Sequence, residues 1–227
     1  GDLAQHPGVV PPLRKEVHYF DLNYARGETW YRAHFGREGD TGINLDASPY
    51  YLFHPAVPAR MHALLPAVKL LVLLRDPVRR AYSHYWHERA RGRETLEFED
   101  AIAAEPARIS AAEAGLADGS IARSAEHQRF SYLARGRYAQ QLERWPALYP
   151  RERLHVVRFE DLVKDPLAGL NETLAFLGLP AASRVDLEAR NTRRYPPLSE
   201  PTAQRLREYF EPHNRHLERL LGRAMGW

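Results

Sequence analysis

Cysteine is absent from the 227-residue chain, and this absence excludes whole classes of structure. Without a thiol, the chain can form neither a disulfide framework nor a thiolate metal site. Nothing in the composition therefore indicates an oxidising compartment, and a cytoplasmic setting fits best. With 44% hydrophobic residues at this length, the chain can bury one sizeable core, so we expect a single domain over residues 1–227.

Long hydrophobic runs are also missing. The longest, residues 68–74, is interrupted by Lys69 and is far shorter than the roughly 20 apolar residues that a membrane-spanning helix needs. The residues from Gly1 onward do not follow the pattern of a signal peptide. We therefore expect a soluble protein without a membrane span.

Lysine is scarce, because only Lys15, Lys69 and Lys164 occur among the 32 basic residues. A GC-rich genome and solvated helix faces would explain this bias. Alternatively, guanidinium groups suit phosphate and sulfate ligands better than ammonium groups do, and composition alone does not separate the two explanations. The basic residues are dispersed along the chain and the formal charge is only +3, which argues against a nucleic-acid partner.

Strands and helices alternate in the predicted secondary structure. A near-continuous apolar run predicts a strand over 68–74, buried on both faces, and Asp76 and Pro77 then begin a helix that runs to about residue 91. A second strand is predicted over 154–159, with weaker ones over 17–20 and 43–46. Further helices are expected over 28–35, 56–65, 98–104, 132–147, 167–177 and 202–221. This alternation predicts an α/β fold with a mostly parallel sheet.

The stretch from Ala107 to Gln128 is polar and alanine-rich and lacks a clean helical or strand period. We expect it to form a mobile loop or lid beside a ligand-binding site.

The junction of the strand at 68–74 with the helix after it carries the strongest functional signal. Arg75 follows the strand, and Arg79, Ser83 and His87 recur every four residues and so share one helix face. The guanidinium, the hydroxyl and nearby amide donors could enclose a phosphate. Alternatively, Arg75 pairs with Asp76 or another carboxylate, and Ser83 is merely tolerated within the helix.

The whole string LLVLLRDPVRRAYSHYWH resembles the 3′-phosphate-binding motif of sulfotransferases that use 3′-phosphoadenosine-5′-phosphosulfate (PAPS). It resembles especially the branch of the heparan sulfate N- and 3-O-sulfotransferases and their bacterial relatives. Further segments resemble that family in the expected order: HPGVVPPLRKEVHYFD, GETWYRAHF, GRYAQQLERWPALYPRERLHVVRFEDLVKDP and NTRRYPPLSEPTAQRLREYFEPHNRHLERLLG. The resemblance implies a three-layer, P-loop-like parallel sheet flanked by helices, with Arg75 and Ser83 binding the 3′-phosphate.

The segment KEVHYFD offers Glu16, His18 and Asp21 beside apolar neighbours. Taken alone it is equally consistent with an exposed edge strand, in which alternation would place Glu16, His18 and Phe20 on one face. The resemblance implies that Glu16 is the general base and that His18 and Asp21 support it. It also matches His87 with a histidine implicated in the N-sulfotransferases.

The segment RNTRRYPPL carries Arg190, Arg193 and Arg194. By itself it could be an ordinary charged surface turn. In the family this loop often contains Lys-Gly-Arg and closes on the cofactor phosphates. Because Asn191 and Thr192 stand where the lysine and glycine would be, the resemblance implies cofactor binding first for Arg193 and then for Arg194.

One element of the family pattern is missing from the chain. The family's N-terminal strand and its Lys/Arg-x-Gly-Thr-[Ser/Thr] loop, which holds the 5′-phosphosulfate, have no counterpart here, and no GxxxxGK[ST] loop occurs. We expect the sequence either to be incomplete at its N-terminus or to lack the loop.

Together these features predict in-line transfer of a sulfuryl group from PAPS to a hydroxyl or amine, without a metal ion. The acceptor is expected to be a small molecule or a carbohydrate; its identity and the oligomeric state are not predicted. One alternative is a P-loop-like nucleotide kinase, which should show a Gly-rich loop and a magnesium-binding carboxylate, and neither is recognisable. The other alternative is a non-catalytic nucleotide-binding module.

Overall fold

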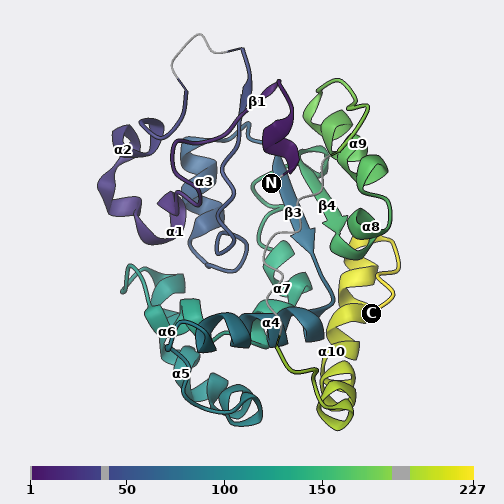
Figure 1. The fold of residues 1–227 in the computed structure, drawn as a ribbon. Coiled ribbons are helices and arrows are strands. Elements are labelled where there is room, and N and C mark those ends of the chain that lie inside the picture. Colours follow the sequence, from purple (N-terminus) through teal and green to yellow (C-terminus); the bar gives the residue numbers. More distant parts are fainter. Residues whose placement is uncertain (1, 37–40, 186–194) are drawn as a thin grey trace. The chain divides into compact units, whose positions relative to one another are not determined.

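The computed structural model describes residues 2–36, 41–185 and 195–227 (Figure 1). Contacts divide the chain into two compact units, each built from two separate stretches. Unit 1 comprises Gly1–Leu73 and Ala147–Arg190, and unit 2 comprises Leu74–Pro146 and Asn191–Trp227. That the whole chain folds as one domain stays a prediction.

Two pairs of strands occur in the described residues, and both involve unit 1. Strand β1 (Val9–Val10) pairs in parallel with β2 (Ile43–Asn44). Strand β3 (Leu70–Leu74) lies beside β4 (Leu154–Arg158), and the two arrows run in the same direction in Figure 1. Parallel strands with intervening helices confirm the predicted α/β class.

Unit 1 surrounds these strands with short helices and an aromatic core. The ring of Tyr19 stacks on that of Tyr31 with 4.7 Å between centroids, and the fully buried Phe20 meets both Tyr31 and Tyr51 edge-on. Such pairs add packing specificity to the burial of large apolar rings. The helices of this unit are η1 (Asp2–Gln5), α1 (Tyr19–Leu22), η2 (Tyr24–Arg26), α2 (Glu28–Arg32), α3 (Val57–Leu64), η4 (Arg151–Arg153), α8 (Phe159–Lys164) and α9 (Pro166–Leu177).

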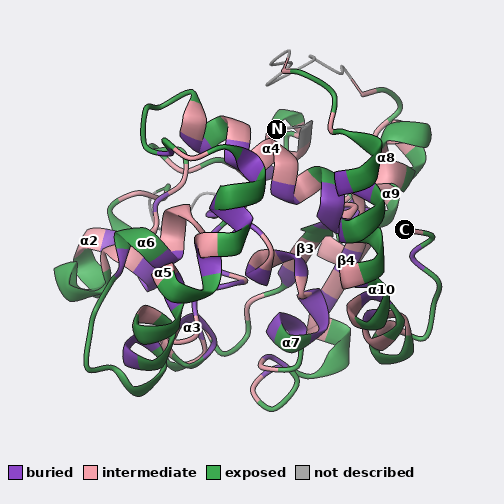
Figure 2. Cartoon of the chain, turned by 90° about the horizontal axis from the view of Figure 1, so that it is seen from below, coloured by how far each residue is buried: buried purple, intermediate pink, exposed green. Residues whose placement is uncertain are grey.

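Unit 2 is a helical unit around a second apolar core. Its helices are α4 (Pro77–Arg89), α5 (Phe98–Asp118), α6 (Ala125–Arg129), η3 (Ala134–Gly136), α7 (Tyr138–Leu142) and α10 (Glu200–Leu221). Buried and exposed residues alternate along α10 (Figure 2), whose Leu206 and Phe210 join Tyr85 and Tyr132 in the core. A Cβ at Gly136 would lie 2.5 Å from the Phe210 ring, so this close approach requires glycine.

The predicted helix after β3 is confirmed. Asp76 caps α4, because its side chain accepts hydrogen bonds from two backbone amides of the first turn, and Pro77 follows at the first helical position. The preceding strand is less buried than predicted, since Leu70 and Leu74 are 8% and 1% exposed but Leu73 is 53% exposed. Among the described strands β3 pairs with β4 alone, and the side chain of Leu73 faces solvent.

The predicted strand over 17–20 is wrong, because a turn precedes helix α1 there. The predicted loop over 107–128 is also wrong for most of its length, since α5 continues to Asp118 and ends at Gly119, whose φ is 81°. Alanine's high helix propensity sustains this helix without a clean period, and Ile109 and Leu116 bury one side of it. In place of the helix expected over 132–147, the structure has only the two shorter helices η3 and α7 in that range.

Candidate functional site

Three polar side chains predicted from the sequence meet in unit 1. The Nδ1 atom of His18 lies 2.8 Å from a carboxylate oxygen of Asp21, and its Nε2 lies 3.6 Å from a carboxylate oxygen of Glu16. Asp21 is buried, whereas 41% of the Glu16 side chain is exposed. The buried carboxylate therefore orients the ring, and the exposed one stays accessible to a ligand.

An unusual backbone brings these groups together. Glu16 and His18 both adopt left-handed conformations, with φ of 55° and 53°, which are uncommon for residues other than glycine. The chain then enters α1, which returns Asp21 to His18 across one helical turn. Glu16 and His18 thus meet through a turn, while Phe20 points into the core; the predicted common face of a strand is wrong.

The environment of His18 changes its protonation. Burial lowers the pKa of His18, but the hydrogen bond and charge of Asp21 and the charge of Glu16 act the other way and leave the pKa above its usual value. The imidazole therefore keeps its proton to higher pH than an exposed histidine would. A protonated ring between two carboxylates can hold both of them in place.

A second layer of polar groups, which the sequence analysis did not identify, lies behind this turn. The backbone amides of His18 and Tyr19 donate to the hydroxyls of Ser48 and Tyr51, and both hydroxyls donate to Asp46. In the sequence, Asp-Ala-Ser-Pro indicates only a turn. No local signal connects that turn with residues thirty positions earlier.

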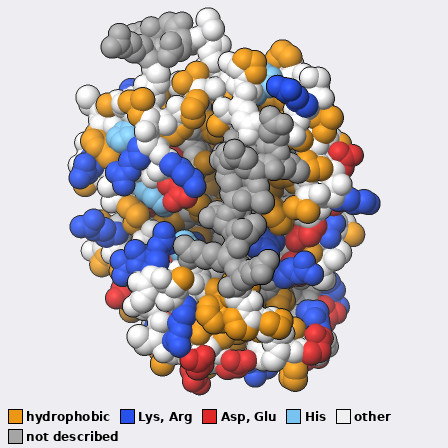
Figure 3. Space-filling model, in the orientation of Figure 1, with side chains coloured by type: hydrophobic (Ala, Val, Ile, Leu, Met, Phe, Trp, Pro, Cys, Tyr) orange, Lys and Arg blue, Asp and Glu red, His pale blue; other side chains and the backbone are white. Residues whose placement is uncertain are grey.

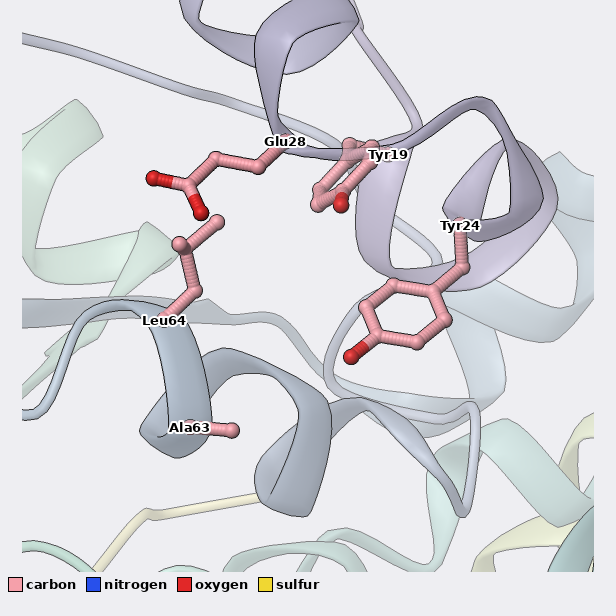
Figure 4. Close-up of a pocket in the computed structure, with 5 residues that line it drawn as sticks. All are labelled: Tyr19, Tyr24, Glu28, Ala63 and Leu64. Atoms are coloured by element: carbon pink, nitrogen blue, oxygen red, sulfur yellow. The ribbon is translucent and has the colours of Figure 1, made fainter.

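An open pocket of about 240 Å³ also lies in unit 1. Figure 4 shows the phenols of Tyr19 and Tyr24 and the carboxylate of Glu28 around it, with Ala63 and Leu64 of α3 on the other side. Burial raises the pKa of Tyr19, and the nearby Tyr24 and Glu28 add to this shift. The polar groups at this pocket are hydroxyls, which both donate and accept hydrogen bonds, and a carboxylate, which accepts them, so it suits a polar ligand with hydroxyl or amine groups.

The predicted phosphate-binding residues lie in unit 2 at the start of α4. The carbonyl of Arg75 accepts a 2.8 Å hydrogen bond from the Tyr138 hydroxyl, which fixes the backbone where β3 gives way to the helix. The carboxylate of Asp76 accepts from the amides of Val78 and Arg79 at 2.8 and 3.2 Å. The amides of Val78 and Arg79 are therefore already paired, and the enclosure of a phosphate by nearby amides stays a prediction.

Further along α4, Ser83 is half-buried and His87 is exposed. The side chain of Arg79 is 72% exposed and lies 3.8 Å from Asp76, and that of His87 is 46% exposed and lies 3.7 Å from Glu88. Arg75, Ser83 and His87 thus belong to one strand-to-helix segment, as predicted. Arg193 and Arg194 lie outside the described residues.

Several arginines of unit 2 serve its structure. Arg80 donates to the carbonyl of Tyr132, Arg108 contacts Glu94 at 2.6 Å, and Arg137 donates to the hydroxyl of Tyr209. Figure 3 shows basic side chains at several places on the visible face, among acidic and apolar ones. Structural contacts thus account for part of the arginine excess.

Within the described residues, no helix combines the length and apolarity needed to cross a bilayer, and no cluster of three or more potential ligands could hold a metal ion.

Comparison with known proteins identifies the family. The sulfotransferase domain model matches residues 17–212, so this chain belongs to that family. The fold agrees with the crystal structure of a sulfotransferase from Alicyclobacillus acidocaldarius at a TM-score of 0.79 and 30% identity, over 98% of this chain and 89% of that one.

Two curated relatives lie in the branch that the motifs indicated. The chain is 32% identical to the bifunctional heparan sulfate N-deacetylase/N-sulfotransferase of Drosophila melanogaster, over 96% of this chain and 24% of that protein. It is 30% identical to human heparan sulfate glucosamine 3-O-sulfotransferase 6, over 99% of this chain and 68% of that protein. The chain spans less than two thirds of the length of the first curated relatives it matches, at 62%, 24% and 60%.

Proposed function

We propose that this chain is the catalytic part of a PAPS-dependent sulfotransferase that acts on a hydroxyl or amine group. The observation that carries the proposal is the Glu16–His18–Asp21 cluster, in which an accessible carboxylate lies 3.6 Å from a histidine held by a buried carboxylate. A positioned carboxylate of this kind suits the removal of a proton from an acceptor.

In this proposal Glu16 is the general base that takes the acceptor proton. His18 holds the Glu16 carboxylate through its Nε2 atom, and Asp21 fixes the ring through Nδ1. His87 is proposed as a further catalytic residue, because its exposed side chain on α4 leaves it accessible to ligands. Positioning and charge stabilisation dominate such group transfers, so the base contributes a minor share, about 10²- to 10⁴-fold.

PAPS, when bound, supplies the activated sulfuryl group and leaves as 3′,5′-adenosine bisphosphate. Arg75 and Ser83 are proposed to hold its 3′-phosphate. They fit an anion, because a guanidinium and a hydroxyl can both donate hydrogen bonds to phosphate oxygens. Arg193 and Arg194 are proposed to add positive charge at the phosphates. No metal ion is required in this proposal.

The acceptor is proposed to be a carbohydrate or another small molecule rich in hydroxyl or amine groups. Support comes from the relatives whose names specify heparan sulfate glucosamine and from the hydroxyl and carboxylate groups at the pocket of Figure 4. A cytoplasmic location also stays a proposal.

The test is transfer of a radiolabelled sulfuryl group from PAPS to a panel of amino sugars, neutral sugars and phenols, with the longest natural form of the protein. The proposal predicts acceptor-dependent label in the product and loss of that label in Glu16→Gln. Binding of 3′,5′-adenosine bisphosphate without transfer to any acceptor would favour a non-catalytic nucleotide-binding module. Transfer of the γ-phosphate of ATP would favour a kinase.

A further inference from the structure

The turn that carries His18 is strained. Left-handed conformations at Glu16 and His18 are unfavourable for residues other than glycine and persist only when the surroundings impose them. Relaxation of either residue toward an ordinary conformation would redirect the chain and separate the side chains. Something outside the turn must therefore stabilise it.

Two hydroxyl groups hold the backbone at this point. The amide of His18 donates to Ser48 Oγ at 3.0 Å, and the amide of Tyr19 donates to Tyr51 Oη at 2.8 Å. Both hydroxyls belong to side chains that are less than 9% exposed. Two consecutive amides at the start of α1 are thus satisfied by residues far along the chain.

One carboxylate orients both hydroxyls. Ser48 donates to one carboxylate oxygen of Asp46 and Tyr51 donates to the other, each at 2.8 Å. A hydroxyl has a single hydrogen to donate, so its bond to Asp46 turns its lone pairs toward the amide of His18 or Tyr19. Only an ionised carboxylate offers two equivalent acceptor oxygens for this purpose.

We propose that Asp46 is a positioning residue for the candidate active site: through Ser48 and Tyr51 it holds the left-handed turn that brings Glu16 and Asp21 to the two nitrogens of His18. The inference rests on the proposed function for its catalytic consequence. Its geometric part concerns only the His18 turn and can be tested without any activity.

The geometry also predicts that loss of the Ser48 hydroxyl and loss of the Tyr51 hydroxyl have different effects. The Ser48 hydroxyl accepts a hydrogen bond from the amide of His18. The Tyr51 hydroxyl accepts one from the amide of Tyr19, whose side chain lines the pocket of Figure 4. Loss of the serine hydroxyl should therefore disturb the histidine and its carboxylates first. Loss of the tyrosine hydroxyl should disturb the pocket wall as well.

The first measurement is nuclear magnetic resonance of the protein with ¹⁵N-labelled histidine. In the wild type, His18 should titrate above about 6.5, the usual histidine value, because Asp21 and Glu16 stabilise its charged form. In Asp46→Asn, one of the two hydroxyls loses its acceptor and a negative charge that favours protonated His18 is also lost, so the midpoint should fall toward the usual value. Ser48→Ala should give the same direction of change.

The second measurement is steady-state kinetics of the same variants. A misplaced catalytic group can cost about 10²-fold in rate, so Asp46→Asn should lower kcat by roughly 10- to 100-fold while the KM for PAPS changes less than about twofold. Once Ser48 and Tyr51 have both been replaced, by Ala and Phe, adding Asp46→Asn should cause little further loss, because the three residues act as one unit.

Glu105→Gln is the matched control. Glu105 is a buried carboxylate of unit 2 that holds two consecutive amides, those of Leu133 and Ala134, at 2.6 and 2.7 Å. Its replacement should lower the melting temperature without moving the His18 midpoint. If Asp46→Asn behaves like this control, losing stability but keeping the His18 midpoint and kcat, the positioning role is wrong.

The two proposals fail in different ways. If the wild type transfers no sulfuryl group but the His18 midpoint still shifts in Ser48→Ala, which removes no charge, the proposed function is wrong and the geometric role stands. If the wild type is active and neither the midpoint nor kcat responds, the function stands and the Asp46 inference is wrong. Should Asp46→Asn fail to fold, Ser48→Ala and Tyr51→Phe test the two hydroxyl groups separately.

Discussion

The segment around His18 and the segment from Arg75 to His87 reach their structures in opposite ways. The first is a strained turn whose amides are satisfied by hydroxyls thirty or more positions away in the sequence. The second is a regular helix with a local cap, in which Asp76 satisfies the amides two and three residues ahead. Long-range contacts thus order the candidate acid–base groups, whereas local rules place the candidate phosphate-binding groups.

The two segments also differ in how exposed their polar side chains are. His18 lies between two carboxylates, one of them buried. On α4 the side chains of Arg79 and His87 remain 72% and 46% exposed. We therefore expect changes at Glu16 and His18 to act on turnover and changes at Arg75 and Ser83 to act on ligand binding.

The largest expected effect is on turnover. Glu16→Gln should slow sulfuryl transfer by about 10²-fold or more and leave the affinity for 3′,5′-adenosine bisphosphate unchanged, because only proton removal is lost. Glu172→Gln is the control, since Glu172 is another accessible carboxylate of unit 1, 3.8 Å from His155. Kinetics and calorimetry on both variants make the comparison, and unchanged turnover in Glu16→Gln would exclude the base assignment.

His18→Ala should slow sulfuryl transfer less than Glu16→Gln does. An equal or greater loss of turnover in His18→Ala would move the base assignment to His18.

The next effect is on nucleotide affinity. Arg75→Ala should weaken binding of 3′,5′-adenosine bisphosphate by about 10- to 150-fold, the worth of a charge-assisted hydrogen bond. Binding of 5′-AMP, which has no 3′-phosphate, should barely change. Ser83→Ala should cost less, about 2- to 10-fold.

Arg158→Ala is the control for this prediction. Arg158 ends strand β4 as Arg75 follows β3, but it contacts the carboxylate of Asp161 at 2.9 Å. Its loss should leave both nucleotides bound as before. Equal losses for the two nucleotides in Arg75→Ala, measured by calorimetric titration, would mean that Arg75 supports the fold or the 5′ side.

Helix capping provides a smaller effect that separates structure from binding. Asp76→Ala should lower the free energy of unfolding by about 1 kcal/mol, because two amides of α4 lose their acceptor. Asp165→Ala is its control, since Asp165 also precedes a proline and caps α9 through the amide of Ala168. Urea unfolding should give similar losses, but only Asp76→Ala should alter bisphosphate affinity. If both leave affinity unchanged, Asp76 is a cap and nothing more.

The smallest expected effect is on the pH dependence of stability. Because the pKa of folded His18 is raised, its interaction with Asp21 contributes stability that is fully present below about pH 6.5 and is lost as pH rises through the folded pKa. Asp21→Asn should therefore destabilise the protein more at about pH 5.5 than at about pH 9. Urea unfolding at both pH values measures this, and an equal loss at the two would show that the histidine is not involved.

Several features of the fold and site were predictable because their causes are local. Residues close together in the chain determine three of these features: the strand within residues 68–74, the start of α4 at Asp-Pro and the two ends of α9. The ordered motifs indicated the family, which the domain model then matched over residues 17–212. The roles of Glu16, His18, His87, Arg75, Ser83, Arg193 and Arg194 stay predictions.

The sequence by itself determined the α/β class, the helix after β3 and the family, because strand hydrophobicity, capping and motif order depend on residues close together in the chain. Only the tertiary structure decided that residues 16–21 form a left-handed turn and a helix and not a strand. The physical reason is that a strained backbone is stable only when distant groups satisfy it. Here those groups are Ser48, Tyr51 and Asp46, and no pattern within residues 16–21 specifies them.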